Sequence, residues 1–172
     1  MTTPISTQRP KSWRSRSSAN AGQVCIAPTR FLIQQGVYEA FVEKFTAAVR
    51  ELKLGNGLED GVTMARCAGR SRRQYRGAGA GRYRPRSEGQ HRRQTRAGKG
   101  NFFEPTVLRD VPLSARAMSE EPFGPVALLR PFATYDEAIA EANRLPYGWP
   151  PTPTAATSPP SMRWGATWRA AC

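Results

Sequence analysis

The sequence predicts an α/β fold built on a largely parallel sheet. Short apolar runs of strand length recur along the chain, at Arg30–Ile33, at Val107–Leu108 and at Val126–Leu129. Patterns of helical period follow the first and the last of these runs. Strands that alternate with helices usually pair in parallel, so we expect an α/β layer.

The first helix is expected after the run Arg30–Ile33. Apolar side chains recur there every three or four residues and give one apolar face: Tyr38, Phe41, Val42, Phe45, Val49 and Leu52. Gly55 follows and is expected to stop this helix.

A capping box predicts the start of the second helix. Thr134 and Glu137 have the required spacing, so the threonine can cap the helix while the glutamate reaches back. The apolar pattern continues through Ala138 and Ala142, and we expect the helix to end before Pro146.

The excess positive charge is confined to three segments. The chain has 172 residues, room for one domain, and a formal charge of +13. Residues 66–96 hold eleven arginines and one acid, whereas residues 1–20 and 149–172 add net charges of +4 and +2. The remainder, 21–65 and 97–148, carries a net charge of −3 and has the composition of an ordinary globular protein.

This distribution predicts the domain organisation. An α/β domain is expected over 21–148, interrupted by a basic irregular segment at 65–96 and flanked by an irregular N-terminal segment, 1–20, and a Pro-rich tail, 149–172. The basic segment and the tail cannot bury enough surface to offset their ordering entropy, so one interpretation is disorder.

The interpretation that we favour is a disrupted reading frame. With suitable GC-rich codons, residues 149–153 read one base back give Leu-Ala-Ala-Tyr-Ala, the start of a plausible helix. Residues 1–20 read in the same way give an amphipathic helix that runs into the following segment. The expected frame changes lie near Ala19, near Met64, near Ala97 and after Gly148.

Cysteine content and hydropathy indicate the cytoplasm. Three cysteines, Cys25, Cys67 and Cys172, do not make a disulfide framework. No apolar run approaches the roughly 18 residues needed to cross a bilayer. The N-terminus carries basic residues but no apolar region typical of a signal peptide.

Two motifs carry the residues suited to chemistry. Asn20–Cys25 places a cysteine two residues after a glutamine, in a glycine-containing turn before an apolar run, and Glu120–Val126 reads Glu-Glu-Pro-Phe-Gly-Pro-Val. A thiolate in an accessible turn is a nucleophile, although a lone cysteine is more often a small buried apolar residue. Glu121 can equally be a solvated loop charge.

Together the two motifs resemble the nucleophile loop and the nicotinamide-ribose loop of NAD(P)-dependent aldehyde dehydrogenases. The resemblance implies that the chain is part of that family's catalytic domain. It further implies that Cys25 attacks the aldehyde carbon, and that its own backbone N–H helps to hold the oxyanion. The Glu121 carboxylate, rather than that of Glu120, would accept hydrogen bonds from the ribose hydroxyls of NAD or NADP. Phe123 would pack near the nicotinamide.

Two further segments resemble the semialdehyde-oxidising branches of the family. They are Asn101–Thr106, whose aromatic residues are expected to pack, and Pro28–Arg30. The resemblance therefore implies oxidation of a semialdehyde, such as succinic semialdehyde, to the acid.

The resemblance covers 20–64 and 97–148 and leaves out much of the family enzyme. The family's phosphate-binding lysine, general-base glutamate, second oxyanion donor and oligomerisation strands have no counterpart in this sequence. We therefore expect a fragment that is inactive on its own, because each missing group costs orders of magnitude in rate. Any homo-oligomer of the family type would have to form without those strands.

The alternative from another class is a basic protein that binds nucleic acid or other polyanions through residues 66–96. Such binding would be non-specific, since regular interleaved aromatic residues are missing. The glycine run Gly77–Gly81 lacks the dinucleotide-binding spacing, and His91 stands alone among arginines, so neither a phosphate loop nor a metal site is expected.

Overall fold

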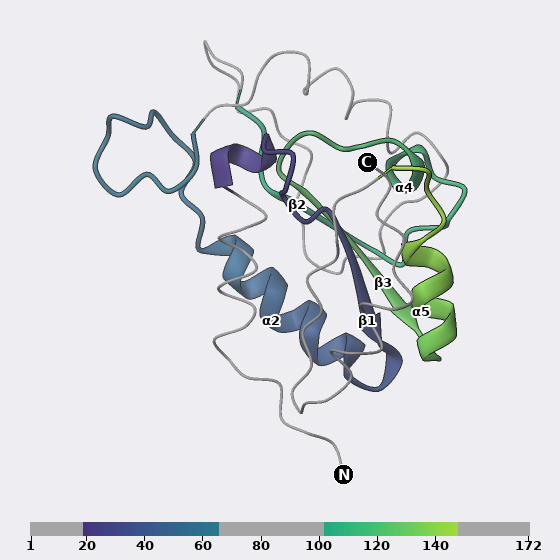
Figure 1. Ribbon diagram of the computed structural model, residues 1–172. Helices are drawn as coiled ribbons and strands as arrows, with labels where there is room; N and C mark the ends of the chain where they lie inside the picture. Colours follow the sequence, from purple (N-terminus) through teal and green to yellow (C-terminus); the bar gives the residue numbers. More distant parts are fainter. Residues whose placement is uncertain (1–18, 66–101, 148–172) are drawn as a thin grey trace.

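A computed structural model describes residues 19–65 and 102–147, and every structural statement below concerns these residues (Figure 1). Residues 1–18, 66–101 and 148–172 lie outside the described part. The Pro-rich tail falls there, and so do residues 1–18 of the expected N-terminal segment and residues 66–96 of the basic segment, together with Cys67, Cys172 and His91.

Three parallel strands form the sheet, as the sequence predicts. They are β1 (Arg30–Gln34), β2 (Thr106–Arg109) and β3 (Val126–Phe132), in the order β1-β3-β2. The central strand β3 pairs in parallel with both neighbours. The predicted α/β fold with a parallel sheet is therefore confirmed.

Strand β3 is longer than predicted, because it continues through Pro131 to Phe132. A proline normally interrupts a central strand, since it has no N–H to donate. Leu128 donates to Thr29 O on the β1 side, and Leu129 O accepts from Asp110 on the β2 side. By this alternation position 131 faces β2, which has already ended at Arg109 opposite Leu129. The missing N–H therefore breaks no pairing.

Helices cover both faces of the sheet (Figure 1). Helix α2 (Tyr38–Arg50) packs on one face and α5 (Tyr135–Ala142) lies on the other, with the short helix α4 (Arg116–Ser119). The core against α2 consists of Phe31, Ile33, Tyr38, Phe41, Val42, Phe45, Ala127 and Leu129. The core on the opposite face consists of Val111, Ala117, Met118, Val126 and Leu128. Successive residues of β3 thus serve opposite cores, as expected for a strand buried on both faces.

Helix α2 confirms the predicted apolar face up to Val49, but Leu52 lies beyond the helix end and packs against Ala21 and Met64. The expected role of Gly55 is also wrong. The helix ends at Arg50, and Gly55 lies well beyond it. The N–H of Gly55 donates to Met64 O at 3.2 Å, and a Cβ at Gly55 would lie 2.7 Å from Val62 Cγ2. Gly55 therefore permits a close approach within the loop that follows α2 and does not cap the helix.

Helix α5 begins at the predicted cap. Thr134 Oγ1 accepts the Glu137 N–H at 3.2 Å, and the Glu137 carboxylate accepts the Ala133 N–H at 2.8 Å. The glutamate thus reaches one residue further back than in the standard box. The helix ends at Ala142, before Pro146 as predicted.

Candidate functional site

Both predicted motifs lie at the amino edge of the sheet, because each directly precedes a strand. Asn20–Cys25 leads into β1, and Glu120–Pro125 leads into β3; we call the latter the cofactor loop, after the role that the sequence resemblance leads us to expect for it. Neighbouring parallel strands begin at the same edge, so the topology brings the two loops together, at the top of Figure 1. Ligands of open α/β sheets usually bind at the carboxyl edge. This candidate site lies at the opposite end.

A left-handed turn precedes Cys25. In η1 (Ala19–Gly22) the φ angles of Asn20, Ala21 and Gly22 are 47°, 54° and 71°. Side chains with a Cβ disfavour this region by about 1–2 kcal/mol each. The turn is held closed by the Gln23 N–H, which donates to Asn20 O at 3.1 Å, and by the Asn20 side chain, which donates to Gln23 O at 3.2 Å.

Burial of Ala21 anchors this turn to the rest of the fold. Ala21 is 3% exposed and forms a small core with Met64, against which Leu52, Leu54 and Phe103 pack. Phe103 also packs against the Val126 core. The expected packing role of the segment 101–106 is thus confirmed for Phe103, while Asn101 lies outside the described residues.

Gly22 and Gly124 bring the two motifs into contact. A Cβ on Gly22 would lie 2.1 Å from Gly124 O, 2.4 Å from Gly124 C and 3.0 Å from Pro125 N. Such distances leave room only for hydrogen at position 22. The turn that carries Cys25 and the loop that carries Glu121 and Phe123 therefore touch backbone to backbone.

Cys25 lies in the turn between Val24 and Ala27, where the Ala27 N–H donates to Val24 O at 2.9 Å. Its side chain is exposed and its thiol is free. Within the described part of the chain, the Cys25 N–H has no hydrogen-bond partner. An accessible thiol next to an unengaged N–H can attack an electrophile and stabilise the oxyanion that forms.

The two adjacent acids of the cofactor loop differ in their partners. Arg116 holds Glu120 through two contacts, Nε to Oε1 at 2.9 Å and Nη2 to Oε2 at 2.8 Å. These hydrogen bonds lower the pKa of Glu120. Glu121 is exposed, and the ring of Phe123 is 38% exposed. A carboxylate and an aromatic ring are thus presented together at the amino edge.

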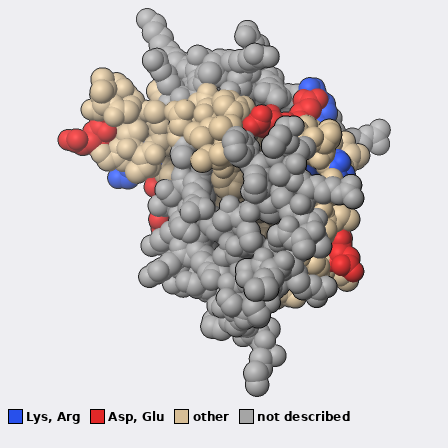
Figure 2. Space-filling view, in the orientation of Figure 1, with Lys and Arg blue, Asp and Glu red and all other residues tan. Residues whose placement is uncertain are grey.

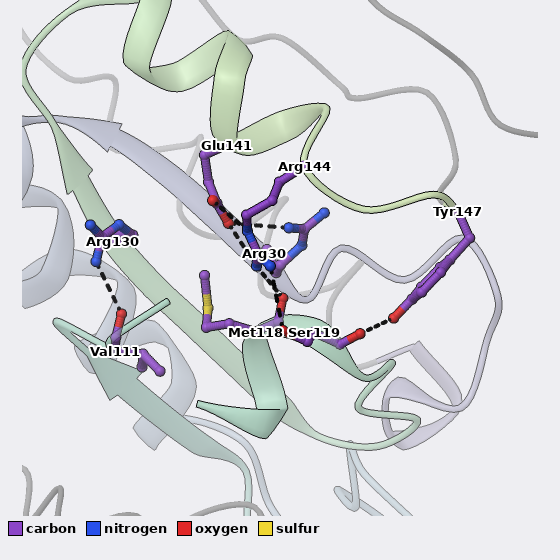
Figure 3. A network of polar contacts seen from close by, with 8 residues as sticks. All are labelled: Arg30, Val111, Met118, Ser119, Arg130, Glu141, Arg144 and Tyr147. Atoms are coloured by element: carbon purple, nitrogen blue, oxygen red, sulfur yellow. Dashed lines mark hydrogen bonds and ion pairs between the residues drawn. The ribbon is translucent and has the colours of Figure 1, made fainter. Parts of the chain in front are cut away.

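A polar network that sequence reasoning missed lies beside the cofactor loop (Figure 3). Its carboxylate is Glu141, which is 8% exposed and is the only buried residue with a charged side chain in the described ranges 19–65 and 102–147. Glu141 pairs with Arg144 at 2.8 Å and with Arg30 at 3.3 Å. Burial lowers the pKa of Arg30, and the nearby Glu141 carboxylate partly counteracts this shift.

The same network reaches the end of α4, where the cofactor loop begins. Arg144 Nη2 donates to Met118 O at 2.7 Å, Arg144 Nη1 donates to Ser119 Oγ at 3.4 Å, and the Tyr147 hydroxyl donates to Ser119 O. The spacing of Glu141 and Arg144 is typical of an exposed helix pair. Nothing in that spacing indicates a contact with α4.

Three wider features of the described residues bear on the class of site. None of their helices is both long and apolar enough to span a bilayer. They contain no group of three metal-binding side chains. On the face shown in Figure 2 their acidic and basic side chains lie in small groups of both signs, without an extended basic patch.

A family model and curated relatives match this chain. The model of the aldehyde dehydrogenase family matches residues 11–151. A 4-(hydroxymethyl)benzenesulfonate dehydrogenase of Comamonas testosteroni is 44% identical over 132 residues, and a glutarate-semialdehyde dehydrogenase of Pseudomonas putida is 40% identical over 134 residues. Each match covers 75% of this chain but only 27% of the relative, so the chain spans about a quarter of their length.

Solved structures give the same result. An aldehyde dehydrogenase from Bartonella henselae superposes with a TM-score of 0.70 at 29% identity, over 83% of this chain and 30% of that protein. The parallel sheet and its flanking helices are therefore shared with that enzyme.

Proposed function

This chain belongs to the aldehyde dehydrogenase family, and we propose that its amino-edge site carries the nucleophile and the cofactor loop of an NAD(P)-dependent aldehyde oxidation. The contact between Gly22 and Gly124 is the observation that carries the proposal. It joins the motif of Cys25 to the motif of Glu121, which are far apart in the sequence.

Cys25 acts as the nucleophile in this proposal. Its thiolate attacks the aldehyde carbon, the electron pair of the C=O bond moves to the oxygen, and a thiohemiacetal forms on the sulfur. The Cys25 N–H, which has no partner among residues 19–65 and 102–147, is the proposed donor for that oxygen. With NAD or NADP bound as hydride acceptor, loss of the C–H hydride would leave a thioester on the sulfur. Water would then add its oxygen to the acyl carbon, which releases the carboxylic acid and restores the thiol.

Glu121 and Phe123 are the residues proposed to hold the cofactor. An ionised carboxylate can accept two hydrogen bonds from a ribose diol, and an exposed ring can pack on a nicotinamide. Both side chains are exposed on one short loop. When bound, NAD or NADP supplies the hydride acceptor.

The proposed substrate is an aldehyde with an anionic group at its other end. The two relatives are named for a sulfonate and for the semialdehyde of a dicarboxylic acid. Both names describe a molecule with one end to be oxidised and one end that is negatively charged. Succinic semialdehyde has the same chemistry and is the substrate we choose for tests.

We further propose that the 172-residue chain does not turn over on its own. The family's general-base glutamate and phosphate-binding lysine match no motif in this sequence, and loss of a general base alone costs about 10²–10⁴-fold in rate. Reduction of NAD or NADP by the purified chain with succinic semialdehyde, abolished by Cys25→Ala, would overturn this part of the proposal.

Acylation of Cys25 tests the nucleophile without any need for turnover. The chain is mixed with p-nitrophenyl acetate, release of p-nitrophenol is followed, and the acetylated cysteine is located by peptide mass spectrometry. We expect acetyl transfer to Cys25 about tenfold faster than to Cys67 or Cys172, and none at position 25 in Cys25→Ser. Equal labelling of the three cysteines would contradict the proposal.

A further inference from the structure

The cofactor loop is fixed at its far end by backbone contacts. Pro125 O accepts the Thr106 N–H at 2.8 Å, which ties the loop to the start of β2. Gly124 is packed against Gly22. Between this end and α4, the side chains of Glu121 and Phe123 are exposed.

The near end of the loop begins at α4, which has only four residues. A helix of this length leaves its last carbonyls without partners inside the helix. Arg144 donates to Met118 O at 2.7 Å, and the Tyr147 hydroxyl donates to Ser119 O. These two carbonyls, directly before Glu120, are thus bound by side chains from the end of α5 and the segment after it (Figure 3).

Glu141 fixes the direction in which Arg144 points. Its Oε2 accepts from Arg144 Nε at 2.8 Å and its Oε1 from Arg144 Nη2 at 3.2 Å, while Oε1 also accepts from Arg30 at 3.3 Å. Two hydrogen bonds between a carboxylate and a guanidinium fix the plane of both groups. The guanidinium is therefore held between α5 and the α4 carbonyls.

We propose that Arg144, oriented by Glu141, is a positioning residue that holds the near end of the cofactor loop, so that Glu121 and Phe123 are presented between two fixed ends. The inference rests on the proposed function, because the role of the loop in cofactor binding comes from there. A buried ion pair is weak evidence for stability, since well-packed apolar residues often serve as well. We therefore assign the Glu141–Arg144 ion pair a role in placing the cofactor loop and not in stabilising the fold.

Local amide hydrogen exchange tests the position of the loop directly. The Glu120 N–H donates to Arg116 O and the Gly124 N–H to Pro122 O, so both amides report on the loop. In the full chain with Arg144→Met we expect both to exchange about tenfold faster, while the amides of α2 keep their rates. Arg109→Met is the matched control, because it removes an ion pair with Glu39 at the carboxyl edge and should leave the two loop amides unchanged.

Tyr147→Phe is a milder second variant in case Arg144→Met does not fold. It removes only the hydroxyl that donates to Ser119 O. We expect a smaller increase in the hydrogen-exchange rate, about threefold, and only at the Glu120 amide. An unchanged rate at Glu120 in Tyr147→Phe and in Arg144→Met, or an equal increase in α2, would overturn the proposal.

Two functional readouts separate positioning from a general structural role. The chain is titrated with NADH at millimolar concentration, and binding is followed by NMR through the amide resonances of the cofactor loop. Cys25 acetylation is measured separately with p-nitrophenyl acetate. Arg144→Met should lower the affinity for NADH about tenfold. It should leave the rate of Cys25 acetylation within about twofold of that of the unaltered chain. Equal losses of NADH affinity and of the Cys25 acetylation rate would overturn the positioning role. If the unaltered chain shows no NADH shifts, the proposed cofactor function fails, and the exchange pattern still decides the position of the loop.

Discussion

Gly22 approaches Gly124 so closely that no side chain fits between them, and this contact brings the two sequence motifs together. Gly22 has a φ of 71°, a conformation that costs a residue with a Cβ about 1–2 kcal/mol. A Cβ there would also lie 2.1 Å from Gly124 O. Both the backbone angle and the space therefore require glycine at position 22.

Gly22→Ala should separate the two loops. The strain and the clash together predict a loss of about 3 kcal/mol in the free energy of unfolding, measured by urea titration. Gly36→Ala is the matched control, because a Cβ at Gly36 would meet nothing within 4 Å. We expect the control to change stability by less than about 1 kcal/mol. A similar loss in both variants would mean that the contact is not tight.

The two adjacent acids of the cofactor loop should respond differently to neutralisation. Glu121→Gln should lower the affinity for NADH about tenfold in the amide titration. The reason is that an amide oxygen accepts hydrogen bonds from ribose hydroxyls less strongly than a carboxylate does. Glu120→Gln removes a charge one residue away that is already paired with Arg116, and should leave NADH affinity within about twofold. The reverse order of the two effects would assign the ribose contact to Glu120.

Much of the fold could be predicted from the sequence because its signals are local. The apolar period of α2 and the Thr134 cap of α5 each depend on residues within one or two turns. The extension of β3 through Pro131 could not be predicted, since it depends on where the neighbouring strand β2 ends. The role of Gly55 could not be predicted for a similar reason, because its close neighbour Val62 is brought to it by the folded loop.

The site could be predicted only as two separate motifs. Cys25, Glu121 and Phe123 follow from resemblance to the family, and the structure places their loops at one edge of the sheet. The roles of Gly22 and Arg144 depend on contacts with Gly124 and Met118, which are distant in the sequence. No local pattern of residue types encodes such a contact.

Truncation of Phe45 should be costly, because this side chain fills the core between α2 and the sheet. It is 0% exposed, and its ring lies 5.2 Å from that of Phe31 and 5.6 Å from that of Phe41. Phe45→Ala should lower the free energy of unfolding by about 3–5 kcal/mol, since it leaves a cavity there. Leu58→Ala is the control, because Leu58 is 94% exposed and should change stability by less than about 0.5 kcal/mol. Equal losses in the two variants would contradict the central place of Phe45.

Tyr38 should make the fold sensitive to alkaline pH. Its hydroxyl is buried, donates to Leu129 O at 3.3 Å and accepts the Asp110 N–H at 3.1 Å. Burial raises the pKa of Tyr38 well above its ordinary value of 10.0. The folded state therefore holds this proton more tightly than the unfolded state, so the stabilisation is complete below pH 10 and is lost as the pH rises further.

Urea midpoints measured between about pH 8 and pH 11 check this expectation. The unaltered chain should lose stability above about pH 10, and Tyr38→Phe should reduce that loss while costing about 1–2 kcal/mol at pH 8 through its two lost hydrogen bonds. Tyr135→Phe changes a half-buried tyrosine on α5 and should keep the alkaline loss. If Tyr38→Phe retains the full loss of stability at alkaline pH and Tyr135→Phe removes it, the phenol that titrates is not that of Tyr38.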